Sequence, residues 1–224
     1  VGAAEASEGV RRHVRAPMFL VRNPVPPGWH FATTQDRSIA REALDLPQGA
    51  PIVTCVGRFS RQKGQDSLID AWSVVSKELP DARLLLVGDG PTGDDLRNRA
   101  PATVIFTGAT NDPRPFLAAC DVAALPSRWE GLSLSMLEAM ASGRSVVTTA
   151  VAGSEVVADS DCGAVVPVDE PQAFARALLP RLSGLIEAEV EGRRGHQYVI
   201  DHHDFDTQMA RFAAVISRAH AFGR

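Results

Sequence analysis

The sequence predicts an α/β domain built on a doubly wound parallel sheet. Short apolar runs alternate with amphipathic stretches along the middle of the chain, which is typical of strand–helix–strand units. Several of the runs are apolar throughout, as strands are when helices cover both faces of their sheet. Of the 224 residues 45% are hydrophobic and 22% are charged, so the chain can bury a full core.

The apolar runs are interpreted as strands and the amphipathic stretches between them as helices. The expected strands are Met18–Val21, Pro51–Gly57, Ala82–Gly88, Val104–Thr107, Val122–Leu125, Ser145–Thr149 and Ala164–Val166. The expected helices span 35–45, 66–79, 93–100, 114–120, 133–142, 153–159, 171–183 and 204–219. Ligands of such sheets bind beyond the carboxyl ends of the strands, so the loops there are the candidate site.

The two ends of the chain differ from this middle. Residues 22–34 carry three prolines and are expected to form an extended connector. We expect one complete Rossmann-like domain at 36–200, preceded at 1–35 by the remnant of a neighbouring domain and a linker. A helix is expected within the tail at 201–224. The chain does not start with Met, and we expect it to be a piece of a longer protein.

Composition excludes several classes of function. The net charge of −4 provides no basic excess for nucleic acid or an anionic membrane. Three isolated cysteines suggest buried, reduced thiols in a cytoplasmic protein, and their spacing predicts neither a disulfide framework nor a metal site. No apolar run approaches the ~18 residues of a membrane span. The six histidines lie in the tails and the connector, where packing is a better interpretation than catalysis.

The stretch RLLLVGDGPTGDDL, residues 83–96, places Gly88, Gly90 and Gly93 in a G-x-G-x-x-G pattern after an apolar run. This is the spacing of a dinucleotide-binding fingerprint. Such a site also needs an acidic residue at the end of the next strand, and TVIFTGAT at 103–110 has none. Two alternatives remain, a tight strand–helix turn that requires small residues or a turn that lines another nucleotide's pocket.

Two other loops follow expected strands and carry groups suited to chemistry. In VTCVGRFSRQKGQDSL, residues 53–68, Gly57 closes the strand and Arg58 and Lys63 follow on one loop. Two cations at the end of a strand suit a diphosphate, because Arg offers a fork of donors and Lys a mobile point charge. The alternative is that these residues are solvated loop charges.

The second loop is LPSRWEGLSLSMLEAMASG, residues 125–143. Glu130 precedes Gly131, a helix begins near Ser133, and Glu138 lies just over one turn inside that helix. The start of a helix offers free backbone N–H groups and the positive end of the helix dipole, which together favour an anion. The loop therefore suits a phosphorylated sugar, with amides for the phosphate and carboxylates for the hydroxyls.

These motifs resemble the retaining glycosyltransferases of family 4, which have the GT-B fold. The E-x7-E signature of that family is matched by Glu130 and Glu138, and its basic pair by Arg58 and Lys63. The resemblance runs from RNPVP at 22–26 to about residue 182. Also similar to the family are LLLVGDGP, VIFTGAT, ACDVAALPS and CGAVVPVDEPQAFARAL.

The resemblance implies the C-terminal, donor-binding half of a GT-B enzyme that uses a nucleoside-diphosphate sugar and neither a metal nor another cofactor. It implies that Arg58 and Lys63 hold the diphosphate and that Glu130 contacts the donor sugar near its reacting face, so these three are the catalytic candidates. Glu138 is implied to bind the ribose hydroxyls. Further donor contacts are implied at Gly57, Gly88, Thr107, Gly108, Gly131, Leu132, Ser133 and Leu134.

The resemblance also has limits. The N-terminal half of the fold, which carries the acceptor site in the family, is not in this chain. We therefore expect no activity from the chain alone, a tail helix that packs on the other half, and membrane contact through that half alone. Ser145 stands where the family usually has Pro, and AGSEVV at 152–157 is one residue short, so no role is assigned to Glu155.

Two other functions are compatible with these residues. One is a stand-alone nucleotide-sugar-binding module, and the other is a nucleotide-sugar epimerase of the GT-B type. The matched E-x7-E signature favours transfer of the sugar. The sequence specifies neither the base and sugar of the donor nor the acceptor.

Overall fold

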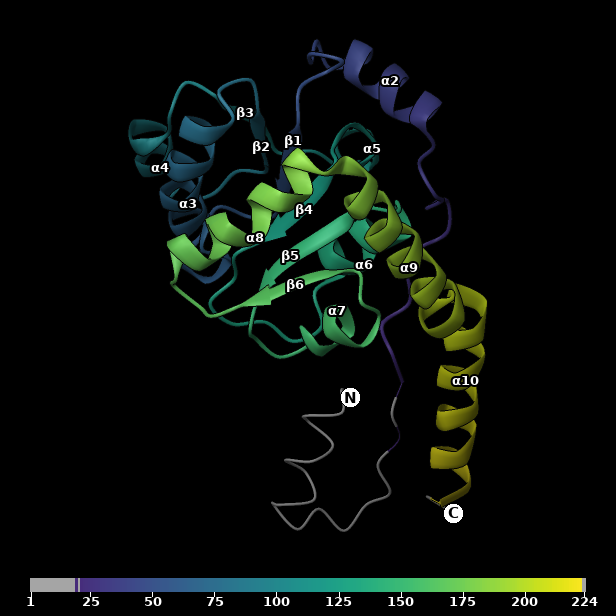
Figure 1. Cartoon of the computed structure of the whole chain (residues 1–224). Coiled ribbons are helices and arrows are strands. Elements are labelled where there is room, and N and C mark those ends of the chain that lie inside the picture. Colours follow the sequence, from purple (N-terminus) through teal and green to yellow (C-terminus); the bar gives the residue numbers. More distant parts are fainter. Residues whose placement is uncertain (1–18, 20, 223–224) are drawn as a thin grey trace.

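The computed structural model describes residue 19 and residues 21–222. Its centre is a six-stranded sheet in the order β3-β2-β1-β4-β5-β6, in which every neighbouring pair is parallel (Figure 1). The doubly wound parallel sheet is thereby confirmed. The strands are β1 Ile52–Val56, β2 Arg83–Val87, β3 Val104–Gly108, β4 Val122–Leu125, β5 Ser145–Thr149 and β6 Gly163–Val166.

Each of these six strands lies within one residue of its expected bounds. The expected strand at 18–21 is the exception. Residues 18 and 20 lie outside the described residues, and Phe19 and Val21 are in no strand. The four-residue apolar run is too short to distinguish a strand from an apolar segment of irregular backbone.

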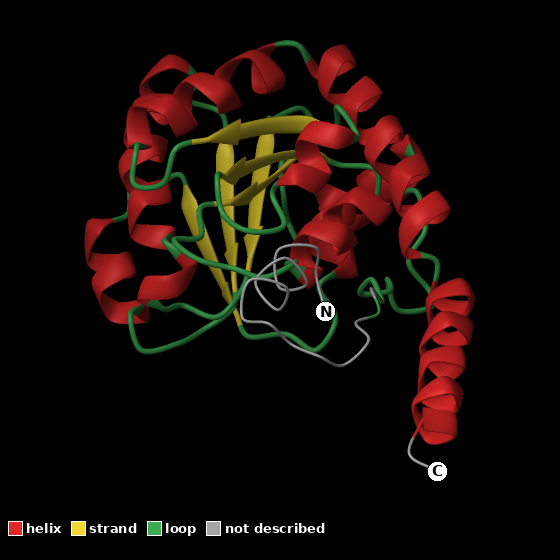
Figure 2. Ribbon diagram, turned by 90° about the horizontal axis from the view of Figure 1, so that it is seen from below, coloured by secondary structure: helices red, strands yellow, loops and turns green. Residues whose placement is uncertain are grey.

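Helices cover both faces of the sheet (Figure 2). One core cluster joins β1 and β2 to α3 and α8, with Phe59 and Trp72 fully buried in it. The other joins the opposite face to α5, α6 and α7, with Leu137 and Met140 fully buried. The helices are α2 Thr34–Ala43, α3 Gln65–Glu78, α4 Gly93–Arg99, α5 Arg114–Ala119, α6 Leu134–Ala141, α7 Glu155–Asp159, α8 Pro171–Ser183, α9 Leu185–His203 and α10 Phe205–Phe222, with a 3-10 turn η1 at Arg61–Lys63.

Helix α9 was not predicted from the sequence. Its glycines lower the helix propensity of the segment, and they serve close packing instead. A Cβ on Gly192 would lie 2.0 Å from the carbonyl oxygen of Gly143, and one on Gly195 would lie 3.0 Å from Cβ of Cys162. These contacts press α9 against the segments that lead into β5 and β6.

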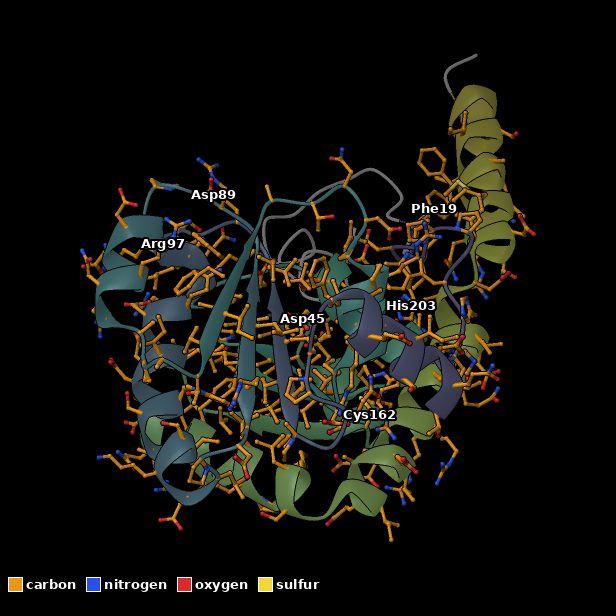
Figure 3. The ribbon with its side chains drawn as sticks, turned by 90° about the horizontal axis from the view of Figure 1, so that it is seen from above. Phe19, Asp45, Asp89, Arg97, Cys162 and His203 are labelled. Carbon is orange, nitrogen blue, oxygen red and sulfur yellow. The ribbon has the colours of Figure 1, made fainter. Side chains whose placement is uncertain are left out.

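The connector is extended, as expected, and it is bound to the domain. The amide of Ala32 donates to the carbonyl of Ser142 at 3.2 Å, and the amide of Val25 donates to the carbonyl of His203 at 2.9 Å. The buried His203 ring also contacts the carbonyl of Asn23 through Nδ1 at 2.8 Å (Figure 3). His203 therefore packs against the connector, in agreement with a packing role for this histidine.

Helix α10 projects away from the body of the domain (Figures 1 and 2). Met209, Phe212 and Ile216 on this helix are 37%, 49% and 44% exposed. Part of the apolar face of the tail helix is therefore exposed, and its packing on another domain stays a prediction. In the part of the chain that the structure describes, no helix has both the length and the apolar character needed to cross a membrane.

Candidate functional site

The candidate site lies where the strand order of the sheet reverses. β1 pairs with β2 on one side and with β4 on the other. The strands β2 and β3 extend the sheet in one direction from β1, and β4, β5 and β6 extend it in the other. The β1 loop (residues 57–64) and the β4 loop (residues 126–133) leave the carboxyl ends of these two strands. In doubly wound sheets the crevice at this point is where ligands bind.

The two loops touch through their backbones. Gly64 has φ +65°, and a Cβ there would lie 2.1 Å from the carbonyl oxygen of Pro126. Glycine is required at this position both for its left-handed conformation and for the close approach. Gly64 is not among the candidate residues from the sequence, although a Gly two residues ahead of the helix expected at 66–79 is a signal that could have identified it.

The contact between the loops brings Lys63 and Glu130 together. Nζ of Lys63 lies 2.5 Å from Oε1 of Glu130, although the two residues are 67 positions apart. The hydroxyl of Ser127 donates to the same carboxylate oxygen at 2.8 Å. Two of the three catalytic candidates therefore form one ion pair at the switch point, with a hydroxyl that holds the carboxylate in place.

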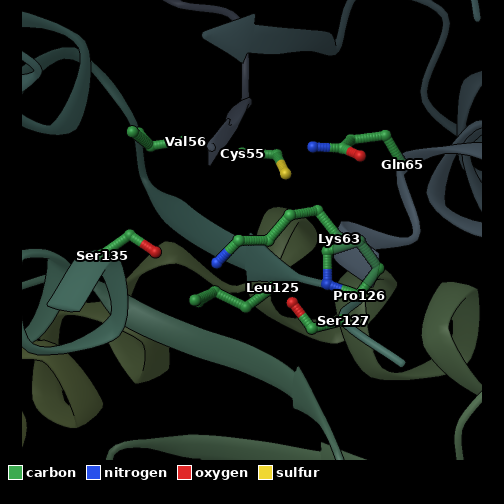
Figure 4. Close-up of a pocket in the computed structure, with 8 residues that line it drawn as sticks. All are labelled: Cys55, Val56, Lys63, Gln65, Leu125, Pro126, Ser127 and Ser135. Atoms are coloured by element: carbon green, nitrogen blue, oxygen red, sulfur yellow. The ribbon is translucent and has the colours of Figure 1, made fainter. Parts of the chain in front are cut away.

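The aliphatic stem of Lys63 crosses a small pocket between the ends of β1 and β4 (Figure 4). Cys55 and Val56 line one side, and Leu125, Pro126 and Ser127 line the other, with Gln65 and Ser135 completing the wall. Burial raises the pKa of the Cys55 thiol to about 12. The thiol therefore stays protonated at neutral pH and is no nucleophile.

The N-terminus of α6 opens beside this pocket. Its cap, Ser133, makes no side-chain bond to the helix backbone, and its hydroxyl lies 3.0 Å from that of Ser135 instead. The first helical bond runs from the Leu137 amide to the Ser133 carbonyl. Among the described residues nothing accepts from the amides of 134–136, so they remain available to an anion.

Glu138 and Arg58 are less tightly placed than Lys63 and Glu130. Glu138 lies one turn into α6 and is partly buried, and this burial raises the pKa of its carboxyl group. Arg58 is exposed, and its guanidinium makes no hydrogen bond or ion pair with any described residue. The structure puts both residues on the correct loop and helix, but no contact joins them to the Lys63–Glu130 pair.

The other candidate positions surround this centre. Thr107 and Gly108 end β3, and the Thr107 hydroxyl lies 3.4 Å from the Leu86 carbonyl. Gly131 is approached from a third segment, since a Cβ on Gly153 would lie 2.4 Å from its carbonyl oxygen. Gly57, Leu132, Ser133 and Leu134 belong to the two loops and the start of α6.

The G-x-G-x-x-G turn serves close packing. A Cβ on Gly88 would lie 2.1 Å from the carbonyl oxygen of Gly57, and one on Gly90 would lie 2.3 Å from that of Phe59. The backbone of the β1 loop therefore passes directly over this turn. Asp89 and Arg97 lie exposed on the same rim, 4.0 Å apart (Figure 3). These contacts explain Gly88 and Gly90 without a dinucleotide, in agreement with the tight-turn alternative.

Arg128 and Asn23 contribute to the site but are not among the candidates from the sequence. Arg128 stands two residues before Glu130 and pairs with Asp66 and Asp169. Asn23 donates from its side-chain amide to the carbonyl of Leu132 at 3.3 Å and so ties the connector to the β4 loop. A cation between a strand end and a candidate carboxylate was a signal for Arg128, whereas Asn23 is identified by the fold alone.

Comparisons with known proteins show which family and which fold the chain resembles. The family model described as glycosyl transferases group 1 matches residues 50–183, which is more than half of the chain. The chain is 34% identical over 169 residues to a lipopolysaccharide core biosynthesis glycosyltransferase, LpsE, of Rhizobium meliloti. It is 33% identical over 180 residues to a GDP-mannose-dependent monoacylated phosphatidylinositol monomannoside mannosyltransferase of Corynebacterium glutamicum.

These matches cover 73% and 75% of this chain but 48% and 47% of the two relatives, so the chain spans about half their length. Among solved structures, it is similar to the C-terminal domain of a glycosyl transferase group 1 family protein, LpcC, of Francisella tularensis. The TM-score is 0.71 at 24% identity, covering 79% of this chain and 96% of that one. At that identity the likeness shows the fold.

Proposed function

The chain belongs to the glycosyl transferases of group 1, and we propose that it is the donor-binding domain of a retaining glycosyltransferase. The donor is a nucleoside-diphosphate sugar, and the acceptor is a hydroxyl group. The observation that carries this proposal is the Lys63–Glu130 pair beside the uncapped N-terminus of α6, at the switch point of the sheet.

The positive groups at this site suit the negative charge that develops on the diphosphate during sugar transfer. Cleavage of the bond between the sugar and the diphosphate leaves negative charge on the diphosphate, and fixed positive groups stabilise it as it forms. Lys63 and the free amides of α6 supply such groups, and the exposed Arg58 adds a mobile one. Glu130 lies against Lys63 and faces the sugar, while Glu138 accepts from the ribose hydroxyls.

The relatives support a donor of this class. One of them is described as GDP-mannose-dependent, which makes a nucleoside-diphosphate hexose the natural class of donor here. Because the chain spans about half the length of such relatives, we assign the acceptor site to a second domain. The apolar face of α10 would pack on that domain, and the chain alone would bind donor without transferring it.

Ligand-dependent thermal stability tests the proposal. The chain is heated alone and with UDP, GDP, ADP or NAD, each in a separate sample. A ligand at 100 times its Kd stabilises the folded state by about 2.7 kcal/mol, which raises the unfolding midpoint by several degrees. We expect a rise with at least one nucleoside diphosphate and none with NAD.

Two results of this measurement would contradict the proposal. A rise with NAD alone would restore the dinucleotide interpretation of the glycine turn. No rise with any of the four ligands at millimolar concentration would remove the donor site from this chain.

A further inference from the structure

The guanidinium of Arg128 joins three segments of the chain. Its Nη1 and Nη2 donate to the two carboxylate oxygens of Asp66, at 2.9 Å each, in the first turn of α3. Its Nε donates to both oxygens of Asp169, at 2.8 and 3.1 Å, in the turn before α8. Nη1 also donates to the carbonyl of Arg61 at 2.8 Å. One side chain thus holds the β4 loop to the β1 loop, α3 and the β6–α8 turn.

The backbones of the two loops are joined at the same place. The amide of Arg128 donates to the carbonyl of Gln62 at 2.7 Å. In return, Nε2 of Gln62 donates to the carbonyl of Trp129 at 3.0 Å. Lys63 directly follows Gln62 and Glu130 directly follows Trp129, so the joined segments are the ones that carry the proposed diphosphate-binding pair.

The contacts among Arg128, Asp66 and Asp169 favour the charged forms of Arg128 and Asp66. Burial works to raise the pKa of Asp66, but the hydrogen bonds and charge of Arg128, together with hydrogen bonds from backbone amides, hold that pKa below its ordinary value. The hydrogen bonds to Asp66 and Asp169 raise the pKa of Arg128 in turn. The side chain of Arg128 is 16% exposed and that of Asp66 is 35% exposed, so water screens this pair less than it screens a surface pair, whereas Asp169 is 53% exposed.

We propose that Arg128 is a positioning residue for donor binding, which locks the β1 loop to the β4 loop so that Lys63 and Glu130 are fixed before the diphosphate arrives. The inference rests on the proposed function. Lys and Glu side chains are flexible, and holding them in place beforehand reduces the entropic cost of binding. Arg128 acts through these two residues and does not itself touch the ligand.

A double-mutant cycle between Arg128 and Lys63 tests this role. UDP, GDP and ADP are each titrated calorimetrically into the wild-type chain, Arg128→Ala, Lys63→Ala and the double variant. For the nucleotide that binds, we expect Arg128→Ala to weaken affinity about tenfold when Lys63 is present and less than about twofold when it is absent. Arg128→Lys should resemble Arg128→Ala, because one ammonium cannot make the bidentate contact with Asp66 and also reach Asp169 and the carbonyl of Arg61.

Two further variants separate positioning from general stability. Asp169→Asn removes one charge from the network and keeps a residue that tolerates the positive φ of 55° at that position. It should fold and weaken binding about threefold. The control is Arg99→Ala, which breaks the exposed 2.7 Å pair between α4 and Asp70 of α3 and should leave affinity unchanged.

Equal losses from Arg128→Ala in the two backgrounds would overturn the positioning role, because a purely structural residue gives additive effects. If UDP, GDP and ADP all fail to bind the wild-type chain, the proposed function fails, and the inference about binding fails with it. Hydrogen exchange then tests the lock itself. Arg128→Ala should reduce amide protection at both 60–64 and 127–131, and unchanged protection would overturn the lock.

Discussion

Partial burial in α6 disfavours the charged form of the Glu138 side chain. The side chain is partly buried in α6 without a described partner, and this burial raises the pKa of its carboxyl group. A carboxylate kept in such an environment has a stability cost, which is the pattern expected of a group that waits for a ligand. The ribose hydroxyls of the proposed donor would supply the missing hydrogen bonds.

The substitution Glu138→Gln removes the ionisable group, so comparing the stability of this variant with that of the wild type across pH measures the cost of burying the charge. Below the ordinary pKa of 4.5 the side chain is neutral in both the folded and the unfolded state. As the pH rises from 4.5 through the raised folded pKa, the wild-type chain loses stability because its unfolded state ionises first, and above the folded pKa the loss is complete. We expect the free energy of unfolding of the Gln variant, relative to that of the wild type, to increase between pH 4 and pH 8. The increase should be less than about 1 kcal/mol, because solvent still reaches the carboxyl group.

Urea unfolding of both proteins across this pH range checks the expectation. Glu78→Gln, at the exposed end of α3, controls for the loss of a charge as such. A stability difference between Glu138→Gln and wild type that stays constant with pH would show that burial does not perturb Glu138.

The predictability of single residues follows from how local their signals are. Arg58, Lys63, Glu130 and Glu138 were identified because each sits at the end of a strand or the start of a helix, in a recognisable spacing. The contacts of Asn23 could not be predicted, because they depend on how the connector packs against the β4 loop. Roles for the four identified residues stay proposals.

At the level of elements, the strands were predictable because each is a short apolar run covered on both faces. Helix α9 was not, because Gly192 and Gly195 interrupt its pattern for a reason that lies elsewhere in the chain. Both glycines make room for backbone or side chains of segments far away in sequence. A pattern within the helix carries no trace of that requirement.

The substitution Gly192→Ala separates helix propensity from packing. In an exposed helix, Ala in place of Gly stabilises by about 1 kcal/mol. Here the new Cβ would lie 2.0 Å from the Gly143 carbonyl oxygen, so α9 must shift, and we expect a net loss of about 1–3 kcal/mol. Chemical unfolding measures the change, with Gly49→Ala as the control because a Cβ there meets nothing within 4 Å. A stabilised Gly192→Ala chain would contradict the close packing of α9.

For the whole molecule, the order of the strands determines where a ligand binds. The sequence predicted a doubly wound sheet and the loops at its carboxyl ends, but not which strands are neighbours. The order 3-2-1-4-5-6 places β1 beside β4, and this arrangement brings Lys63 within 2.5 Å of Glu130. The pairing of β1 with β4 joins segments about seventy positions apart, so no local pattern could have predicted the distance between these groups.

The most direct test of the donor site is to map the bound nucleotide by amide chemical shifts. The isotope-labelled chain is titrated with UDP and with GDP, and the perturbed amides are placed on the structure. The account predicts that the largest changes fall in the β1 loop at 57–64 and across 130–138, at the start of α6. Changes that leave both of these segments unperturbed, or that are centred on the opposite ends of the strands, would contradict it.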